Sequence, residues 1–122
     1  MIVIVAWTSI ATVNGLTTLV SPHPQINGDF GSSVAVGDRV VVVGAPSETV
    51  SGKNYAGRAY VFALTGALII TLVSPNSQTI GAFGVSVAVG DGVVVVGAPS
   101  ETVSGKATAG RAYVFALTGA LS

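Results

Sequence analysis

Side chains that could act in catalysis or binding occur in two polar stretches, 53 residues apart. Residues 47–55 combine serine, glutamate, lysine, asparagine and tyrosine, and residues 100–108 repeat most of these types. A serine nucleophile needs a base such as histidine to activate it, yet neither stretch contains histidine. The single His23 lies in another loop, and Asn76 takes its place 53 residues later. We therefore expect the chain not to be an enzyme.

The remaining ligand-type residues do not form a pattern that holds a metal ion. Cysteine is absent, and one histidine cannot build a histidine cluster within a chain. Asp38 and Asp91 each follow a glycine in a short turn, where aspartate is a common turn former. Calcium takes about six to eight oxygen ligands, and one carboxylate per turn does not supply them. We expect no metal and no cofactor.

Composition excludes two classes of partner. Only 8% of the residues are charged, and five acidic side chains balance five basic ones. Nucleic acid is therefore not an expected partner, because its binding needs a basic patch. The apolar N-terminal segment resembles part of a secretion signal but lacks a basic region, and polar residues interrupt it before about 20 residues, so we expect no membrane span.

The positions of the polar stretches follow from an internal duplication. Residues 18–69 and 71–122 align at an offset of 53 without a gap, and 42 of the 52 paired positions are identical. A period near 50 indicates a solenoid, a propeller or another repeat array. We call these segments the first and second copy, and residues at this offset equivalent.

Each copy reads as a set of short strands. In the first copy, valine-rich and aromatic segments at 33–36, 40–43, 58–64 and 67–73 are bounded by Gly, Pro, Asp and Ser. Tight turns are expected at 37–39 and 90–92, and longer loops at 21–29 and 45–57. No segment has the period of a helix. The sequence predicts an all-β chain with four strands per repeat.

A known family shares the main motifs. Phe30-Gly31, the segment 43–46 and the segment 57–62 resemble the FG-GAP repeat of integrin α-subunit propellers and their microbial relatives, and the second copy matches at 83–84, 97–99 and 110–115. The resemblance implies that each copy is a four-stranded β-propeller blade. It also implies ligand binding on the face with the long loops, and it favours an extracellular or cell-surface location, although the compartment stays open.

Strand assignment by this resemblance leaves the second blade without its outer strand. The expected divisions are an N-terminal strand segment at 1–17, one blade repeat at 18–70, and a second at 71–122 that lacks this strand. The missing strand is present at the other end of the chain, as Leu16, Thr17, Thr18, Leu19 and Val20. The sequence TLVSP at 18–22, where this segment ends, is repeated at 71–75, where the outer strand of the first blade ends.

Two blades do not close a ring, since propellers typically have about four to eight. We expect a homo-oligomer in which this N-terminal strand completes the last blade of a neighbouring copy. Three copies give six blades and are the first choice, four give eight, and two give four. Residues 2–7 form either a fifth strand or a segment packed elsewhere on the ring.

The long loops are the expected binding surface, with glycans or protein surfaces as ligands. The alternatives are a structural, engineered or truncated fragment whose only activity is assembly, and an enzyme whose site forms at a chain interface. Glu48 with Lys53, and Glu101 with Lys106, could pair across their loops. The candidate ligand-binding residues are Ser47, Glu48, Ser51, Lys53, Asn54, Tyr55, Ser100, Glu101, Ser104 and Lys106.

Overall fold

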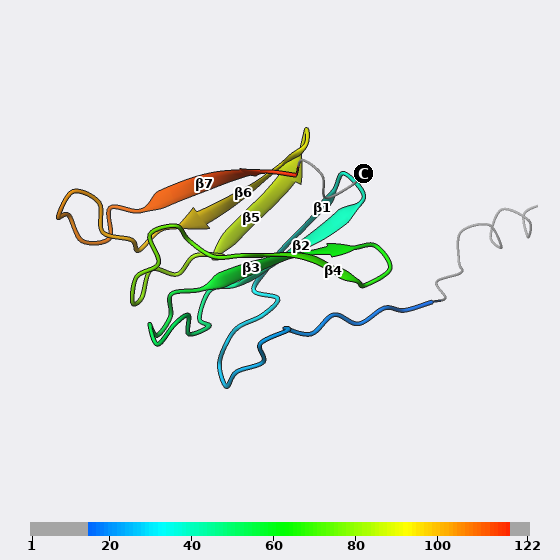
Figure 1. The fold of residues 1–122 in the computed structure, drawn as a ribbon, viewed down its shortest axis with the longest axis horizontal. Coiled ribbons are helices and arrows are strands. Elements are labelled where there is room, and N and C mark those ends of the chain that lie inside the picture. Colours follow the sequence, from blue (N-terminus) through cyan, green and yellow to red (C-terminus); the bar gives the residue numbers. More distant parts are fainter. Residues whose placement is uncertain (1–14, 118–122) are drawn as a thin grey trace, which may run out of the picture.

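A computed structural model of the protein describes residues 15–117 and contains two antiparallel sheets (Figure 1). The first has the order β1-β2-β3-β4 and the second β5-β6-β7. The strand bounds are Ser33–Gly37 for β1, Val40–Ala45 for β2, Arg58–Ala63 for β3, Leu68–Leu72 for β4, Ser86–Gly90 for β5, Val93–Ala98 for β6 and Arg111–Ala116 for β7. Residues 15–117 contain no helix, so none there is long and apolar enough to cross a membrane. The all-β prediction is confirmed.

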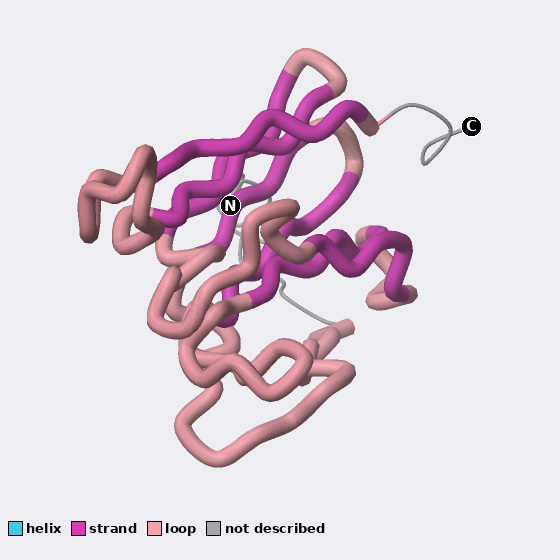
Figure 2. The backbone as a smooth tube through the Cα atoms, turned by 60° about the vertical axis from the view of Figure 1, so that its left-hand side comes forward, coloured by secondary structure: helices cyan, strands magenta, loops and turns pink. Residues whose placement is uncertain are grey.

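Turn chemistry explains the connections. Asp38 and Arg39 both have positive φ, at 50° and 65°, and Asp91 and Gly92 repeat this geometry at 51° and 79°. Two successive positive φ values give the type I′ turn, whose twist matches that of a hairpin. These turns lie at one end of the strands, whereas the long loops gather at the other end (Figures 1 and 2).

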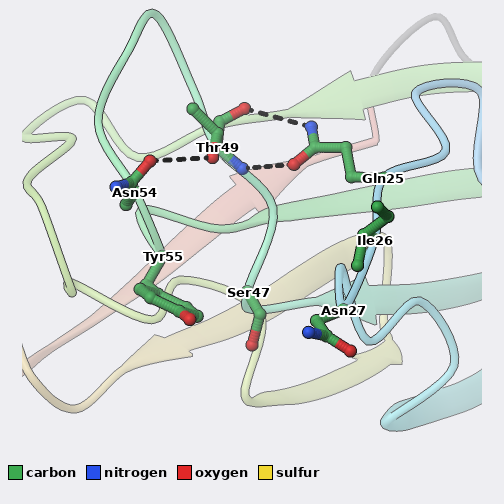
Figure 3. Close-up of a pocket in the computed structure, with 7 residues that line it drawn as sticks. All are labelled: Gln25, Ile26, Asn27, Ser47, Thr49, Asn54 and Tyr55. Atoms are coloured by element: carbon green, nitrogen blue, oxygen red, sulfur yellow. Dashed lines mark hydrogen bonds between the residues drawn. The ribbon is translucent and has the colours of Figure 1, made fainter.

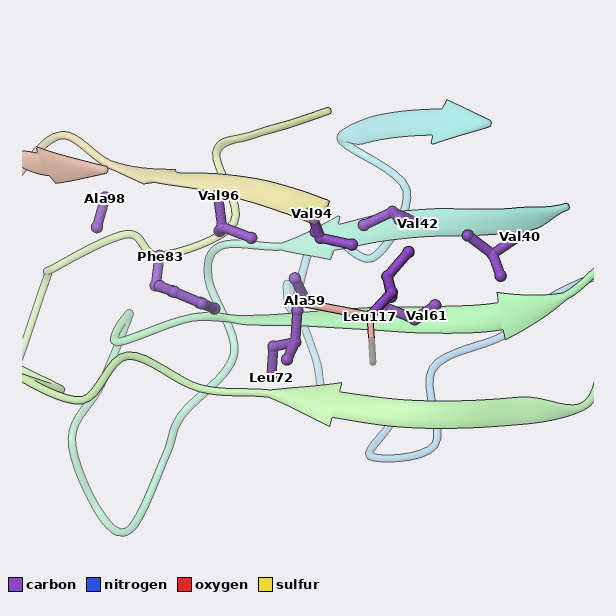
Figure 4. Close-up of a cluster of buried hydrophobic side chains, with 10 residues drawn as sticks. All are labelled: Val40, Val42, Ala59, Val61, Leu72, Phe83, Val94, Val96, Ala98 and Leu117. Carbon is purple, nitrogen blue, oxygen red and sulfur yellow. The ribbon is translucent and has the colours of Figure 1, made fainter. Parts of the chain in front are cut away.

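The two sheets pack on each other through opposite sides. We call face X the side of a sheet that carries Val42 and Val61 or their equivalents Val95 and Val114, and face Y the other side. Face X of the first sheet packs on face Y of the second (Figure 4). Face X of the first sheet contributes Val40, Val42, Ala59, Val61 and Leu72 to the buried cluster. The second blade contributes Phe83, Val94, Val96, Ala98 and Leu117 on its Y side.

A smaller cluster covers the part of face Y of the first sheet that β2 and β3 form. Its buried members are Val43, Ala45, Tyr60 and Phe62, and Leu19, Phe30 and Val41 pack against them. Six of their equivalents in the second copy face the first sheet in the main cluster or pack beside it, and the seventh, Leu72, joins that cluster from β4 of the first sheet. Face Y is therefore an apolar surface in both blades.

The N-terminal segment does not form a strand in the single chain. Residues 15–20 are not in a strand, and Leu16 and Val20 are 90% and 69% exposed. The sequence predicts that this segment pairs with a strand of a second copy. A single chain does not contain that partner strand. The expected strand at 2–7 and the C-terminal residues 118–122 lie outside the described residues.

Candidate functional site

A buried carboxylate joins the long loop of the first blade to its sheet. Glu48 is fully buried, and it accepts hydrogen bonds from Ser21 Oγ at 2.6 Å and from Tyr60 OH at 2.5 Å. Arg58 Nη1 lies 3.2 Å from Glu48 Oε1 and also donates to the Thr49 carbonyl at 3.1 Å. A buried carboxylate is stable when it is paired and hydrogen-bonded, as here.

The second blade repeats this arrangement. Glu101 is fully buried and accepts from Ser74 Oγ at 2.6 Å and from Tyr113 OH at 2.5 Å, with Arg111 Nη1 at 3.1 Å. His23 Nδ1 lies 3.1 Å from Tyr60 OH, and Asn76 Nδ2 makes the equivalent contact to Tyr113 OH at 3.2 Å. Because asparagine occupies the histidine position in one of the blades, this contact does not need an acid or a base.

The network changes the chemistry of one tyrosine. Burial, followed by the hydrogen bond to Glu48, raises the pKa of Tyr60 to about 12. Tyr60 is therefore a neutral donor at ordinary pH. The hydroxyls of Ser21 and Tyr60 are both donated to one carboxylate, an arrangement that supports the loop.

The expected loop pairs between glutamate and lysine are not formed. Glu48 pairs with Arg58 and Glu101 with Arg111, both on the third strand of their blade. Both glutamates were candidates for ligand contact, but their burial removes them from the loop surface. The physical reason is that the loop folds back over its sheet, which brings the carboxylate to an arginine ten residues later.

Four other candidates lie at the tips of the loops. Val50 and Lys53 exchange backbone hydrogen bonds of 3.1 and 2.8 Å, and Val103 and Lys106 do the same. Ser51 and Ser104 occupy the turns between them, with φ of 50° and 52°. These tips are exposed, and their serines and lysines face solvent as separate groups.

A polar pocket of about 220 Å³ lies between the loops of the first blade (Figure 3). Thr49 N donates to Gln25 Oε1 at 2.7 Å, Gln25 Nε2 donates to the Thr49 carbonyl at 3.3 Å, and Thr49 Oγ1 donates to Asn54 Oδ1 at 3.2 Å. The lining residues are Gln25, Ile26, Asn27, Ser47, Thr49, Asn54 and Tyr55.

Sequence reasoning found part of this pocket. Ser47, Asn54 and Tyr55 were candidates and lie together in it, whereas Ser100 belongs to the other blade. Gln25, Ile26, Asn27 and Thr49 lie in the loops that were expected to bind, but they were not among the candidate residues. A usable signal was present: Ile26, Asn27, Asn54 and Tyr55 all differ from their equivalents, Thr79, Ile80, Ala107 and Thr108. Four of the ten differences between the copies therefore lie in the lining of one pocket.

Sequence reasoning also missed the buried network. Its serine, glutamate, arginine and tyrosine are identical in the two copies, and only the position of His23 changes. Asp38 has a similar structural task, since its Oδ2 accepts a 2.7 Å hydrogen bond from Gly92 N in the other blade. Among residues 15–117, no three His, Asp or Glu side chains come together in a way that could hold a metal ion.

Comparisons with known proteins agree with the duplicated architecture. A family profile described as FG-GAP repeat matches residues 18–62 and 70–115. No curated protein matches the chain. The crystal structure of the computationally designed Ika4 protein is similar in fold, with a TM-score of 0.50 and 20% identity over 87% of this chain and 51% of that one. The chain thus spans about half the length of the designed protein.

Proposed function

The chain belongs to the FG-GAP repeat family, and we propose that it is a non-enzymatic β-propeller module that assembles with copies of itself and binds ligands through its long loops. One observation carries the assembly. Within residues 15–117, β7 ends the second sheet without a fourth strand, while residues 15–20 pair with no strand of their own chain. The free edge and the free segment are complementary, because an unpaired edge is a template for another strand.

The position of Leu19 supports this reading. Its equivalent Leu72, in the outer strand β4, packs in the cluster that contains Phe83 and Val94 of the following blade. Leu19 packs in the same way in the cluster that contains Phe30 and Val43 of its own first blade. At Leu19, the N-terminal segment therefore lies against the first blade as β4 lies against the second at Leu72. This position supports the proposal that the segment is the outer strand of a preceding blade.

The preceding blade would come from another copy. Strand β4 pairs with β3 through Ala59 and Leu72, so Leu19 would pair with Ala112 of a neighbour. Three copies give a ring of six blades and four give eight, both within the usual range of about four to eight. Every blade would then have four strands.

Mass in solution tests this assembly. Native mass spectrometry of the whole chain should give a closed oligomer at micromolar concentration. Thr17→Pro with Thr18→Pro removes two backbone donors from the segment and should shift the mass to a single chain. The control Ile26→Thr changes an exposed loop residue to its equivalent, and should leave the mass unchanged. A wild-type chain that stays monomeric contradicts the proposal.

For the ligand, we favour a neutral carbohydrate bound in the polar pocket. Amide and hydroxyl groups of Asn27, Ser47 and Asn54 line it beside the ring of Tyr55, which is 49% exposed. One pocket per chain would be repeated around a ring, and such multiplicity raises avidity for repeated sugars.

A glycan array tests the ligand. Asn54→Ala with Tyr55→Thr converts the loop to the sequence of its equivalent, so it should abolish binding while the fold is kept. Lys53→Ala, at the exposed tip of the same loop, should bind as wild type. Binding that survives the double variant contradicts a site at this pocket.

A purely structural role is the second candidate. The near-identity of the copies and the fold likeness to a designed protein both favour an engineered or truncated fragment whose only activity is assembly. Assembly without binding to any glycan or protein surface would support this alternative. A cell-surface or extracellular location belongs to the binding hypothesis and fits the family resemblance.

A further inference from the structure

The contact between the two blades is made by two different faces, and each face has an unpacked equivalent elsewhere in the chain. Face X of the first sheet packs on face Y of the second. On face X of the second sheet, Val114 is 67% exposed, whereas its equivalent Val61 is fully buried. On face Y of the first sheet, Val34 and Val36 are 65% and 70% exposed.

The equivalents of these two valines show what such positions do when a blade is present. Val87 and Val89 pack against the buried cluster between the sheets. Within residues 15–117, the chain thus leaves exposed face X of the second sheet at Val114 and the β1 part of face Y of the first sheet, whereas the β2 and β3 part of that Y face is already buried in the smaller cluster. Such a head-to-tail pair of surfaces generates rings when the rotation closes.

The backbone of one blade approaches the other closely at Gly37, but the equivalent glycine in the second blade has no such neighbour among the described residues. A Cβ atom added at Gly37 would lie 3.0 Å from the Val89 carbonyl oxygen and 3.3 Å from Val89 Cγ1. The equivalent of Gly37 is Gly90, where no described atom lies within 4 Å. The equivalent of Val89 is the exposed Val36. Glycine at position 90 leaves room for a neighbour that residues 15–117 do not supply.

In the loops, too, a contact that is formed between the two blades has an equivalent that is not formed within residues 15–117. Backbone N–H groups of Ile80, Ala82 and Phe83 donate to the carbonyls of Asn54, Tyr55 and Ala56 at 2.7, 2.9 and 3.0 Å. The equivalent donors belong to Asn27, Asp29 and Phe30, which have no backbone acceptor within residues 15–117. The equivalent acceptors belong to Ala107, Thr108 and Ala109. A cavity of about 330 Å³ lies beside the free donors, with Leu19, Asp29 and Phe30 in its lining.

Residue size at one position of this contact also differs in a complementary way. The bulky Asn54-Tyr55 pair bonds to the backbone of Ile80 and Ala82, where residue 82 is small. The smaller Ala107-Thr108 pair would face Asn27 and Asp29, where residue 29 is larger. The exchange of large and small side chains is confined to the pair Tyr55 and Ala82, whose equivalents are Thr108 and Asp29.

We propose that face X of the second blade docks on face Y of the first blade in the next copy of this chain, reproducing the internal contact between the blades. The proposal rests on the assembly described above and names the surfaces that hold it. Gly90 of one copy then lies on Val36 of the next, and residues 107–109 enter the cavity beside Asp29. The contact is separate from strand exchange, since Gly90 is on β5 and the exchanged strand joins β7 at the opposite edge of the sheet.

Two measurements on the whole chain test this contact. Gly90→Val has space within the chain and lacks a positive φ, so it should fold as wild type but run as a single chain by native mass spectrometry. Val36→Cys with Gly90→Cys introduces the only thiols, because the chain has no cysteine. Mild oxidation should give disulfide-linked oligomers on a non-reducing gel, and a reductant should return them to one chain. As a control, Ser51→Cys with Gly90→Cys should not cross-link.

The outcomes separate this inference from the proposed assembly. An oligomeric Gly90→Val variant, or no cross-link between positions 36 and 90, overturns the inference even if the proline variants still dissociate the wild-type oligomer. A wild-type chain that is monomeric overturns both. Circular dichroism of each variant confirms that a loss of mass is not a loss of fold.

Discussion

Tyr60 donates a 2.5 Å hydrogen bond to Glu48 Oε1, and both side chains are fully buried. The bond joins strand β3 to the loop that follows β2, so the loop is fixed to the blade at its base. The second blade holds its loop in the same way through Tyr113 and Glu101. Exposed loop tips can therefore vary in sequence while the blade beneath them stays the same.

Alkaline pH should destabilise the chain through Tyr60. Its pKa is raised from 10.0 to about 12 in the folded state, so the folded state holds the proton more tightly. The associated stability is fully present below about pH 10 and is lost as the pH rises towards 12. Two pKa units correspond to roughly 3 kcal/mol. Urea unfolding at a series of pH values should show this decline, and Tyr60→Phe should reduce it.

Glu48→Gln should lower the free energy of unfolding by about 3 kcal/mol, because it breaks a buried ion pair and leaves donors without a charged acceptor. The matched variant Glu101→Gln should cost less, since the partner Arg111 is 28% exposed and Arg58 only 13%. Urea unfolding at one fixed chain concentration compares the two variants. Equal losses would contradict the link between burial and cost.

His23→Asn should change the free energy of unfolding by less than about 0.5 kcal/mol. Asparagine at the equivalent position 76 already makes the contact to a tyrosine hydroxyl. Thermal unfolding measures the effect, and His23→Ala, which removes the contact to Tyr60, should be less stable than His23→Asn. A large loss in the asparagine variant would show that the imidazole has a task of its own.

Gly57→Ala should be severely destabilising, by more than about 4 kcal/mol. Its φ is +89°, and an added Cβ would overlap the Phe83 carbonyl of the facing blade. Gly52→Ala is a matched control, because it has a φ of +80° but no atom within 4 Å. It should cost about 1–2 kcal/mol, the strain of the backbone alone. Soluble yield and urea unfolding distinguish the two.

Arg39→Gly should stabilise the chain by about 1 kcal/mol. Arg39 has a φ of 65°, which strains a residue with a Cβ, and Gly92 occupies the equivalent turn position at 79°. Thermal unfolding should show a higher midpoint than wild type. A lower midpoint would indicate that the Arg39 side chain makes a contact worth more than the strain.

Local residue chemistry was sufficient to predict the strands and the tight turns. Runs such as 40–43 and 93–96 are β-branched, and Gly-Asp at 37–38 and 90–91 marks the hairpins, so neighbours in the chain decide these elements. The duplication also predicted two blade-like sheets, with three strands in the second among the described residues. These features depend on interactions between residues that are close in sequence.

The tertiary structure decided what the loop side chains do. Glu48 was expected to pair with Lys53 at the loop surface, but it lies under the loop beside Ser21 and Tyr60, which are 27 and 12 residues away. Likewise, only the packed structure assigns Val61 to a buried contact and its equivalent Val114 to an exposed face. These two valines occupy equivalent positions in near-identical copies, yet their surroundings differ because burial depends on which sheet lies opposite. The sequence of one copy does not determine what packs against it.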